Sequence, residues 1–323
     1  MDRGLSAPPR WRRRRRRPEE LRGWYPRWFL ASLASPATWW MLLFLALPLF
    51  TMVAVAFGSV DPLFGSPIPV WNPLRWDGST VAGVLGQLVR PEGAFFAPTL
   101  RTVSYTAIAT GLCLAIGYPV AYTVSRHAHR WKGALLGVLL APFFISYLMR
   151  MLAWVNLLRD DGLVNRVLEA LPFAQPQQWL GGKPITVILG LVYGYIPYMI
   201  LPLFGSLDAV DRSLIEGARD LGARPSEVFR RITWPLSRPA VVAGVLIVAL
   251  PITGDYYTAD LLSGSPRTTM LANQIDFLLH ARNAGPTVGA ALVCLLAAAL
   301  ILPMLWYLRL VGDAAIERDG GTG

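Results

Sequence analysis

Six apolar stretches, each long enough to cross a bilayer, constrain this chain more than any other feature. A spanning helix needs about 20 mostly apolar residues. The stretches lie near residues 37 to 57, 98 to 125, 133 to 157, 185 to 207, 239 to 262 and 286 to 310. In lipid the backbone satisfies its polar groups only in helices or a closed barrel, and the alternating pattern of barrel strands is absent. With 54% hydrophobic and 15% charged residues, the chain is predicted to be an all-α membrane protein with six transmembrane helices.

The basic residues predict the orientation of these helices. Most of the 30 Lys and Arg residues fall in segments that are cytoplasmic if the N-terminus is cytoplasmic. The positive-inside rule therefore predicts that the N- and C-termini are cytoplasmic. The predicted organisation is a basic, disordered cytoplasmic arm at residues 1–36, a transmembrane domain at 37–312 and a cytoplasmic tail at 313–323.

The Arg-rich run from Arg10 to Glu20, "RWRRRRRRPEE", admits two other interpretations, a nucleic-acid patch and a twin-arginine export signal. The apolar segment that follows begins well after the run, is too long for a signal sequence and lacks a small-residue cleavage site. We therefore predict that the arm is attracted to anionic membrane lipid and binds no nucleic acid.

Cysteine and histidine residues indicate no metal or catalytic site. Cys113 and Cys294 both fall inside spans and are interpreted as small apolar packing residues, too few for a disulfide framework or a structural zinc site. His127 and His129 would face different directions on a helix, and His280 is alone. No catalytic residue and no metal ligand is predicted.

Three external loops connect the predicted spans. Residues 58–97 are rich in Pro, Gly and Trp and are predicted to be irregular. Residues 158–184 contain apolar residues at helical spacing, including Leu163 and Val167, which predict a short helix. Residues 263–285 have an amphipathic pattern.

A highly charged segment at residues 208–238 separates the fourth and fifth spans. Ser213 and Glu216 have the spacing of a capping box, in which each side chain satisfies a free backbone N–H at the start of a helix. Apolar residues then recur on one face. Gly222 is expected to end this helix, because glycine commonly follows the last helical residue.

A second short helix is predicted directly afterwards. Pro225 suits its first turn, Pro235 is expected to end it, and Pro239 suits the start of the next span. Such a helix pair is too polar to enter lipid and too short to fold alone. It is therefore either a latch over the cytoplasmic ends of the bundle or a docking surface for a soluble partner.

This segment closely resembles the "EAA…G…I-LP" loop of permease subunits of ATP-binding-cassette (ABC) importers. The matching residues are Glu216, Gly217, Ala218, Gly222, Ile232 and Pro235. Two positions depart from the pattern: Gly217 stands for the usual Ala, at a cost of about 1 kcal/mol inside a helix, and Trp234 stands for the usual Leu. In that family the loop forms the coupling helix, which fits into a cleft of the ATPase subunit. Glu216 is left with two candidate roles, helix cap and partner contact.

Three further blocks resemble the polyamine branch of that family, the spermidine and putrescine permeases. They are Pro142–Leu158, Gly190–Asp211 and Pro251–Gly264. The resemblance implies a type I ABC importer permease fold with six transmembrane helices, located in the bacterial inner membrane. It implies three partners: an ABC ATPase dimer, a second and related permease subunit, and an external substrate-binding protein.

Two alternatives stay open at this point. One keeps the importer but changes its cargo to thiamine, ferric iron or another organic cation. The other is a membrane-embedded enzyme or a stand-alone secondary transporter, for which neither a catalytic cluster nor a paired inverted repeat is detectable. No phosphate-binding loop of the form GxxxxGKS or GxxxxGKT occurs, so the chain is not expected to hydrolyse ATP or to bind a cofactor. The resemblance places ATP and magnesium on the ATPase subunit.

Ionisable residues inside spans are the best indication of a translocation path, because burying them in lipid is expensive. Arg150 and Asp255 each lie ~25 Å along their predicted helices from the cytoplasmic ends. We expect them to form an ion pair, structural or gating in role, with Asp260 closer to the mouth. Polyamines carry several positive charges on a thin methylene chain, so their path needs carboxylates and aromatic faces. The predicted path residues are Arg150, Trp154, Tyr195, Asp255, Tyr256 and Asp260.

Overall fold

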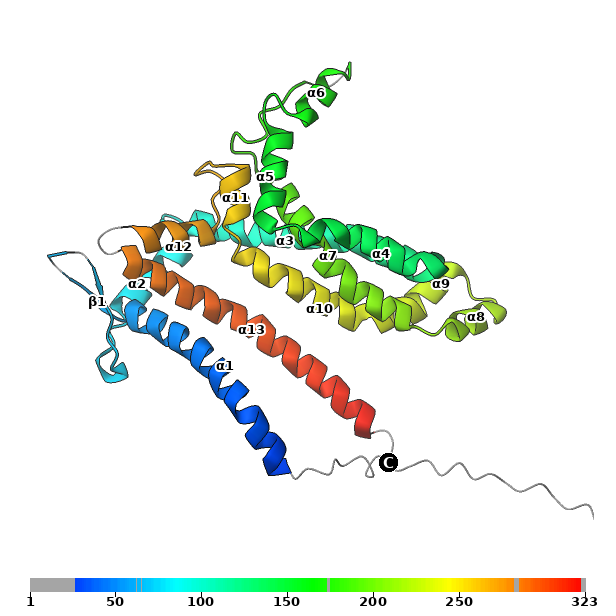
Figure 1. Ribbon diagram of the computed structural model, residues 1–323, viewed down its shortest axis with the longest axis horizontal. Helices are drawn as coiled ribbons and strands as arrows, with labels where there is room; N and C mark the ends of the chain where they lie inside the picture. Colours follow the sequence, from blue (N-terminus) through cyan, green and yellow to red (C-terminus); the bar gives the residue numbers. More distant parts are fainter. Residues whose placement is uncertain (1–26, 62, 65, 173–174, 282–284, 321–323) are drawn as a thin grey trace, which may run out of the picture. The chain divides into compact units, whose positions relative to one another are not determined.

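The computed structural model describes residues 27–61, 63–64, 66–172, 175–281 and 285–320 (Figure 1). The Arg-rich run at Arg10 to Glu20 lies outside the described residues, and its interpretation stays a prediction. The elements up to the second external loop are α1 (Arg27–Ala56), β1 (Ser59–Val60), β2 (Pro67–Ile68), η2 (Pro73–Arg75), α2 (Ser79–Val89), α3 (Phe96–His127), η3 (His129–Trp131), α4 (Lys132–Leu140), η4 (Ala141–Phe144), α5 (Tyr147–Leu158) and α6 (Leu163–Glu169). The elements after it are α7 (Pro184–Ala209), α8 (Arg212–Asp220), α9 (Pro225–Val228), η5 (Phe229–Thr233), α10 (Trp234–Thr253), α11 (Tyr257–Leu262), α12 (Leu271–His280) and α13 (Gly285–Gly320).

Among the described residues, five helices are long and apolar enough to cross a membrane, or six if one sharply bent pair counts as a span. The five are Ser35–Ala56, Phe96–His127, Pro184–Ala209, Pro225–Thr253 and Gly285–Arg309. Each overlaps a stretch predicted from the sequence, and the bent pair overlaps the remaining stretch. The predicted membrane architecture is therefore confirmed, whereas the orientation of the termini stays a prediction.

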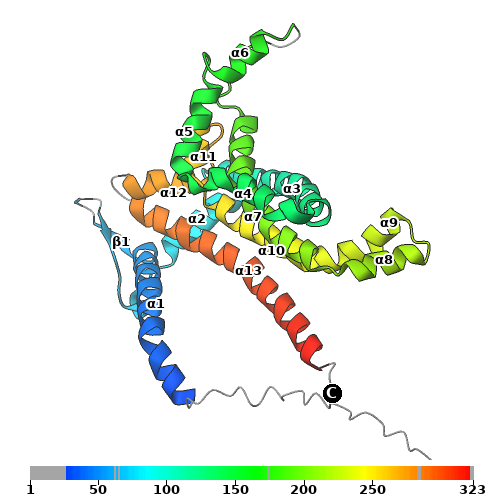
Figure 2. The same ribbon diagram turned by 45° about the vertical axis from the view of Figure 1, so that its right-hand side comes forward.

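Helices α3, α7 and α10 pack together and form the main apolar core (Figures 1 and 2). Met199 of α7 is fully buried in it. A Cβ on Gly117 of α3 would lie 3.2 Å from Met199 Cγ, and a Cβ on Gly244 of α10 would lie 2.8 Å from Met199 Sδ. The two glycines therefore leave the space that this methionine fills, as small residues do where membrane helices approach closely.

The third predicted span, residues 133–157, is not a continuous helix. The helical segments Lys132–Phe144 and Tyr147–Glu169 are bent by 86° relative to each other, and Figures 1 and 2 show α5 and α6 turning away from α4. Ile145 and Ser146 between them have ψ values of 141° and 140°, which are extended. Two extended residues cannot continue the hydrogen-bond ladder of a helix, so the prediction of an uninterrupted span is wrong.

Residues 58–97, predicted to form an irregular external loop, contain regular structure. Strands β1 and β2 form an antiparallel pair, and α2 follows at Ser79–Val89. Asp77 accepts hydrogen bonds from the backbone N–H and the hydroxyl of Ser79 at 2.9 and 2.8 Å. The backbone hydrogen bond is the main reason why the pKa of Asp77 lies below its usual value. The prolines and glycines of this segment indicated a loop, and helix α2 was therefore not predicted. Asp77 stabilises the start of α2 through its two hydrogen bonds with Ser79.

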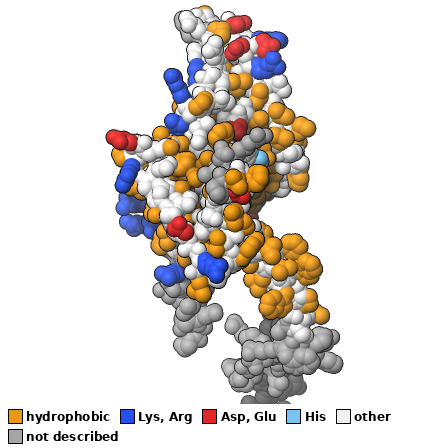
Figure 3. Space-filling view, turned by 90° about the vertical axis from the view of Figure 1, so that its left-hand side faces the viewer, with side chains coloured by type: hydrophobic (Ala, Val, Ile, Leu, Met, Phe, Trp, Pro, Cys, Tyr) orange, Lys and Arg blue, Asp and Glu red, His pale blue; other side chains and the backbone are white. Residues whose placement is uncertain are grey.

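The short helix predicted in the second external loop is confirmed as α6. Leu163 and Val167 on it are exposed. Asn165 is buried, and its Oδ1 accepts hydrogen bonds from the Gln177 backbone N–H at 3.0 Å and from Trp179 Nε1 at 3.1 Å. These bonds tie the two halves of the loop together. Figure 3 shows charged side chains gathered at the end of the molecule that α6 forms.

Helix α12 is the amphipathic segment predicted within residues 263–285. Its Leu271 and Ile275 are buried in a second apolar cluster with Val84 of α2 and Leu292 of α13. The backbone N–H of Leu271 donates to the Thr102 hydroxyl of α3 at 2.7 Å. Helix α12 is therefore held on its apolar face by α2 and α13 and at its first residue by α3.

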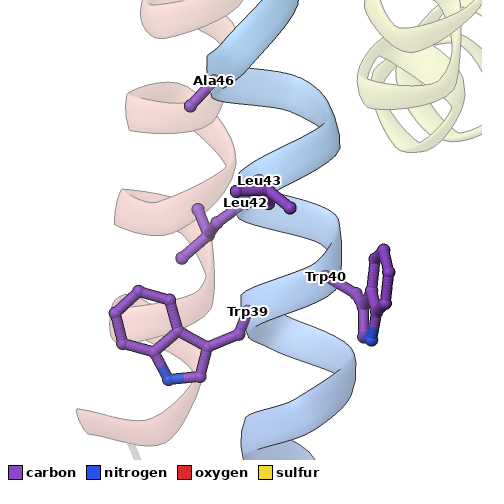
Figure 4. A pocket seen from close by; sticks show the side chains of 5 residues that line it. All are labelled: Trp39, Trp40, Leu42, Leu43 and Ala46. Atoms are coloured by element: carbon purple, nitrogen blue, oxygen red, sulfur yellow. The ribbon is translucent and has the colours of Figure 1, made fainter.

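The part of α1 up to Phe50 belongs to a compact unit of its own. It carries a shallow apolar hollow lined by Trp39, Trp40, Leu42, Leu43 and Ala46 (Figure 4). The two indole rings point to different sides of the helix, and Trp40 stacks on Phe44 with 5.1 Å between ring centroids. Apolar side chains exposed on all sides, with tryptophan among them, are typical of a helix in contact with lipid.

Substitution of Gly117 by leucine is expected to destabilise the core, because the new side chain must displace Met199. Overpacking of this kind costs about 1–3 kcal/mol and should lower the thermal unfolding midpoint of the purified protein. Gly111→Leu is the matched control on the same helix, since a Cβ at Gly111 has no atom within 4 Å. Equal midpoints for the two variants would contradict the proposed contact.

Candidate functional site

A buried carboxylate is the centre of a polar cluster inside the bundle. Asp255 is 6% exposed and follows the end of α10 at Thr253 instead of lying within a helix, as the predicted fifth span had it. It accepts hydrogen bonds from the hydroxyls of Tyr147 at 2.8 Å, Tyr195 at 3.2 Å and Thr258 at 2.6 Å, and from the Thr258 backbone N–H at 3.0 Å. Four donors thus replace the water that a carboxylate needs.

Two of these donor residues lie at the start of a helix that follows a break in the chain's helical structure. Tyr147 is the first residue of α5, directly after the bend, and Thr258 lies in the first turn of α11. Tyr195 comes from the middle of α7. A Cβ on Gly194 would lie 2.8 Å from the ring of Tyr147, so only glycine at this position lets the ring lie against α7.

The predicted ion pair between Arg150 and Asp255 is wrong, since no salt bridge joins these two described residues. Arg150 is 7% exposed, and its guanidinium carbon lies 4.4, 5.4 and 5.9 Å from the ring centroids of Phe143, Tyr147 and Tyr193. Its Nε and Nη1 have no hydrogen-bond partner in the described part of the chain. Tyr147 contacts both charges, because its ring faces Arg150 and its hydroxyl donates to Asp255.

Four of the six predicted path residues meet in this region. Trp154 packs edge-on against Tyr193 with 5.4 Å between centroids, next to Arg150. The ring centroids of Tyr147 and Tyr195, whose hydroxyls both donate to Asp255, are 6.0 Å apart. The four are Arg150, Trp154, Tyr195 and Asp255.

Tyr256 and Asp260 face a different neighbour, helix α12. The side-chain amide of Asn273 donates to Asp260 Oδ1 at 2.7 Å and to the backbone carbonyl of Tyr256 at 2.8 Å. Asp260 is therefore engaged in attaching α11 to α12, and the structure does not bring it to the Asp255 cluster.

Three residues of the cluster were not predicted, namely Phe143, Tyr147 and Thr258. Thr258 had a readable signal, because Asp255 stands three residues before it, at the spacing of an N-terminal helix cap. Tyr147 had a weaker one: it precedes Arg150 by three residues, which places the two on one helix face. Phe143 lies beyond the bend and had none.

The helix pair predicted in the charged segment is present, but its first helix begins earlier than predicted. Asp211 is the N-cap of α8 and accepts a hydrogen bond from the Ser213 backbone N–H at 2.9 Å. This bond is the main reason why the pKa of Asp211 is lowered. The predicted capping box of Ser213 and Glu216 is therefore wrong, because an equally good capping residue stands two positions before Ser213.

The turn between the two helices is as predicted. Gly222 has φ +84°, a left-handed conformation that glycine adopts without penalty. Its N–H donates to the Arg219 carbonyl at 2.9 Å, and the N–H of Ala223 donates to the Ala218 carbonyl at 3.0 Å. These two bonds are the Schellman arrangement that ends a helix.

The second helix does not end at Pro235, contrary to the prediction. Pro225 is its first residue, as expected, but α9 continues through the π-helical turn η5 into α10. The N–H of Trp234 donates to the Phe229 carbonyl, five residues back. Pro235 has no N–H to donate, and it comes directly after this wider π turn. The regular α-helical hydrogen bonding is already interrupted there, so the helix continues through the proline.

The predicted coupling residues are spread over this unit. Glu216, Gly217 and Ala218 lie on α8, Gly222 lies in the turn, Ile232 lies in η5 and Pro235 lies at the start of α10. None of them is buried.

No residue of α8 is buried. Leu214 of α8 is 53% exposed and Leu221, directly after α8, is 91% exposed. Ile215 and Ala218 are half-buried, so the apolar face that the sequence predicted is uncovered in part. Glu216 lines a shallow hollow together with Tyr122 and Arg126 of α3. A hydrogen bond holds the chain to α3 just before α8: the Arg126 guanidinium of α3 donates to the carbonyl of Val210, between α7 and α8, at 3.2 Å.

Comparison with known proteins gives one family and one fold. Residues 13–313 match the family described as binding-protein-dependent transport system inner membrane component. The chain is similar to the spermidine/putrescine transport system permease protein PotB of Haemophilus influenzae, with 32% identity over 264 residues that cover 80% of this chain and 87% of the relative. The corresponding protein of Escherichia coli is 32% identical over 241 residues, 73% of this chain and 81% of the relative.

A more distant relative is the inner membrane ABC transporter permease protein YdcU of Escherichia coli, 27% identical over 239 residues, 62% of this chain and 76% of the relative. Among solved structures, a chain of a bacterial alginate ABC transporter in complex with alginate pentasaccharide-bound periplasmic protein has a TM-score of 0.68 at 17% identity, covering 87% of this chain and 92% of that chain. This structural likeness concerns the fold.

Replacing Asp255 is expected to separate its two structural roles, acceptor and charge. Asp255→Ala leaves three hydroxyls without their acceptor and should destabilise the protein by about 1–3 kcal/mol. Asp255→Asn keeps one acceptor oxygen and should be closer to the original protein. Thermal unfolding of the two purified variants checks this order, and a more stable alanine variant would rule out the cluster as drawn.

Proposed function

The chain belongs to the family of binding-protein-dependent transport system inner membrane components, the permease subunits of ABC importers, and we propose that its cargo is a polyamine of the spermidine and putrescine class. The observation that carries this proposal is the buried Asp255 carboxylate, which is ringed by tyrosine hydroxyls and stands beside several aromatic faces. Carboxylates and aromatic faces attract a thin polycation. The 32% identity with two spermidine/putrescine permeases supports the same cargo.

Permeases of this family act with a substrate-binding protein and an ATPase. For this chain we propose an ATPase dimer on the cytoplasmic side, a second and related permease subunit, and an external protein that delivers the polyamine. The chain itself then neither hydrolyses ATP nor binds a cofactor, and ATP and magnesium belong to the ATPase. The uncovered apolar residues Leu214 of α8 and Leu221 directly after it are the surface that the ATPase would cover.

The helix that follows connects this surface to the buried carboxylate. Pro225–Thr253 is one continuous helix of 29 residues, about 40 Å long at 1.5 Å per residue. Its cytoplasmic end carries the turn after α8, and its other end stops two residues before Asp255. Phe229 packs edge-on against Tyr118 and Tyr122 of α3, with centroids 6.0 and 6.1 Å apart. A displacement of α8 by the ATPase would therefore move the end of α10 and the Asp255 turn together.

The cargo is tested by uptake into proteoliposomes that contain the assembled importer, with radiolabelled spermidine, putrescine, thiamine and ferric iron offered in turn by the binding protein. We expect uptake of the two polyamines. Asp255→Asn should lower this uptake roughly tenfold, which corresponds to about 1.4 kcal/mol of lost charge interaction, while assembly with the ATPase is retained. Asp276→Asn on α12, whose charge faces His280, is the control with unchanged uptake.

The result that would sink the cargo proposal is transport of thiamine or iron with no transport of either polyamine. Polyamine uptake that is equal in Asp255→Asn and in the original importer would remove Asp255 from the path without affecting the cargo.

Coupling to the ATPase is tested at the Gly222 turn. A Cβ at Gly222 meets no atom within 4 Å, so only its positive φ disfavours other residues, by about 1–2 kcal/mol. We expect Gly222→Val to reduce cargo-stimulated ATP hydrolysis of the importer, and Gly222→Asn to retain most of it, because asparagine tolerates this conformation. Equal loss in both variants would show that the φ angle is not what matters. Gly217→Ala, which should stabilise α8 by up to about 1 kcal/mol, is the control expected to keep full activity.

A further inference from the structure

Three aromatic rings surround one buried cation. One ring comes from η4 before the bend, one from α5 after the bend and one from α7. We call Phe143, Tyr147 and Tyr193 the ring cage; the cation inside it is the guanidinium of Arg150, at 4.4 to 5.9 Å from the three centroids. We propose that the ring cage is an ammonium-binding site of the translocation path and that Arg150 occupies it when no cargo is present. This inference rests on the proposed polyamine function.

The chemistry of the cage suits an alkylammonium group as well as it suits a guanidinium. Ring faces carry partial negative charge and attract either cation. The Tyr147 hydroxyl donates to the Asp255 carboxylate at 2.8 Å, so this carboxylate lies at the edge of one cage ring and contributes negative charge to the same region. A polycation threading past α7 would therefore find both an aromatic and a carboxylate partner where Arg150 now lies.

Arg150 is held in a way that permits exchange. A buried arginine bound to a carboxylate is costly to release, because an uncompensated charge remains behind. Here Asp255 already has four hydrogen-bond donors of its own. Nε and Nη1 of Arg150 have no partner within the described residues. Removal of the guanidinium therefore breaks no salt bridge and leaves the Asp255 cluster complete.

The bend provides a way to open the cage. Phe143 belongs to η4 before the bend and Tyr147 to α5 after it, with extended Ile145 and Ser146 between them. Tyr193 belongs to α7, which is packed in the main core. A change of the 86° angle therefore moves Phe143 and Tyr147 apart while Tyr193 keeps its place. Because Arg150 and Tyr147 share α5, this opening also breaks the hydrogen bond from Tyr147 to Asp255 and leaves that carboxylate with its three other donors.

An anion bound by the unpartnered N–H groups of Arg150 is the opposite interpretation. The negative faces of three rings and the Asp255 carboxylate nearby disfavour an anion at this place. A purely structural Arg150 is the third interpretation. The experiment below distinguishes all three.

The test measures equilibrium binding of radiolabelled spermidine to the assembled permease and ATPase complex in lipid nanodiscs, without nucleotide and without the binding protein. Arg150→Gln and Arg150→Met remove the competing charge at similar side-chain length, and methionine also packs well on rings. We expect both variants to bind spermidine roughly tenfold more tightly than the original complex. Arg150→Lys keeps a cation and should stay near the original affinity. Adding Tyr193→Leu to Arg150→Gln should abolish the gain.

A second measurement uses the complex without any substitution. Phenylglyoxal modifies accessible guanidinium groups, and mass spectrometry of the peptide reports the modified fraction of Arg150. Saturating spermidine is expected to increase this fraction several-fold, because the cargo displaces Arg150 from the cage. An unchanged or lower fraction would overturn the proposal even where the neutral variants fail to assemble.

Each remaining outcome has a definite meaning. Neutral variants that assemble but bind spermidine no more tightly leave Arg150 a structural residue and overturn the inference. The same result follows if the original complex binds acetate or sulfate and Arg150→Gln does not, because the site is then an anion site. If tetramethylammonium binds more tightly to Arg150→Gln and spermidine does not, the cage is supported and the proposed polyamine cargo is wrong.

Discussion

Tyr147 holds two buried charges of the bundle, Arg150 and Asp255, in place, and the polar interior around them depends on it. Its ring lies against the Arg150 guanidinium and its hydroxyl donates to the Asp255 carboxylate. Direct contact between the charges would give a tighter pair but would also fix α5 to the α10–α11 turn. With a phenol between them, each charge is stabilised by several weaker contacts from different helices. Gly194 is part of the same arrangement, because the ring needs the space that its missing side chain leaves.

Irregular backbone occurs where these side chains can use it. The bend at Ile145 and Ser146 delivers Tyr147, and the end of α10 exposes a turn in which Asp255 caps the next helix through Thr258. Within a membrane protein, such breaks are tolerated where protein groups satisfy the freed backbone. Broken helices also mark the binding regions of many transporters. The cluster around Asp255 therefore combines a structural need with the place where a proposed polycation would pass.

Sequence reasoning succeeded where one local rule decided the outcome. The lengths of the apolar stretches located the spans, and Gly222 and Pro225 each have a conformational preference that their neighbours do not override. It failed where two rules competed. Asp211 and Ser213 are both good helix caps, and only the start of the helix decides between them. The Arg150–Asp255 pair failed for a different reason: position along a helix gives depth, but the direction of a side chain and a hidden bend are set by tertiary contacts.

The π turn at Phe229–Thr233 affects how the residues before it and after it are placed around the axis of the long helix Pro225–Thr253. Each residue of an α-helix advances the chain by about 100° around the axis. The turn accommodates one residue more than an α-helical turn would. Because the surplus residue is taken up within one turn, deleting it would restore an α-helix of regular pitch while α9 keeps nearly the same azimuth relative to α10. The π turn thus shifts the sequence register between α9 and α10 by one position without turning α8 to another side of the long helix.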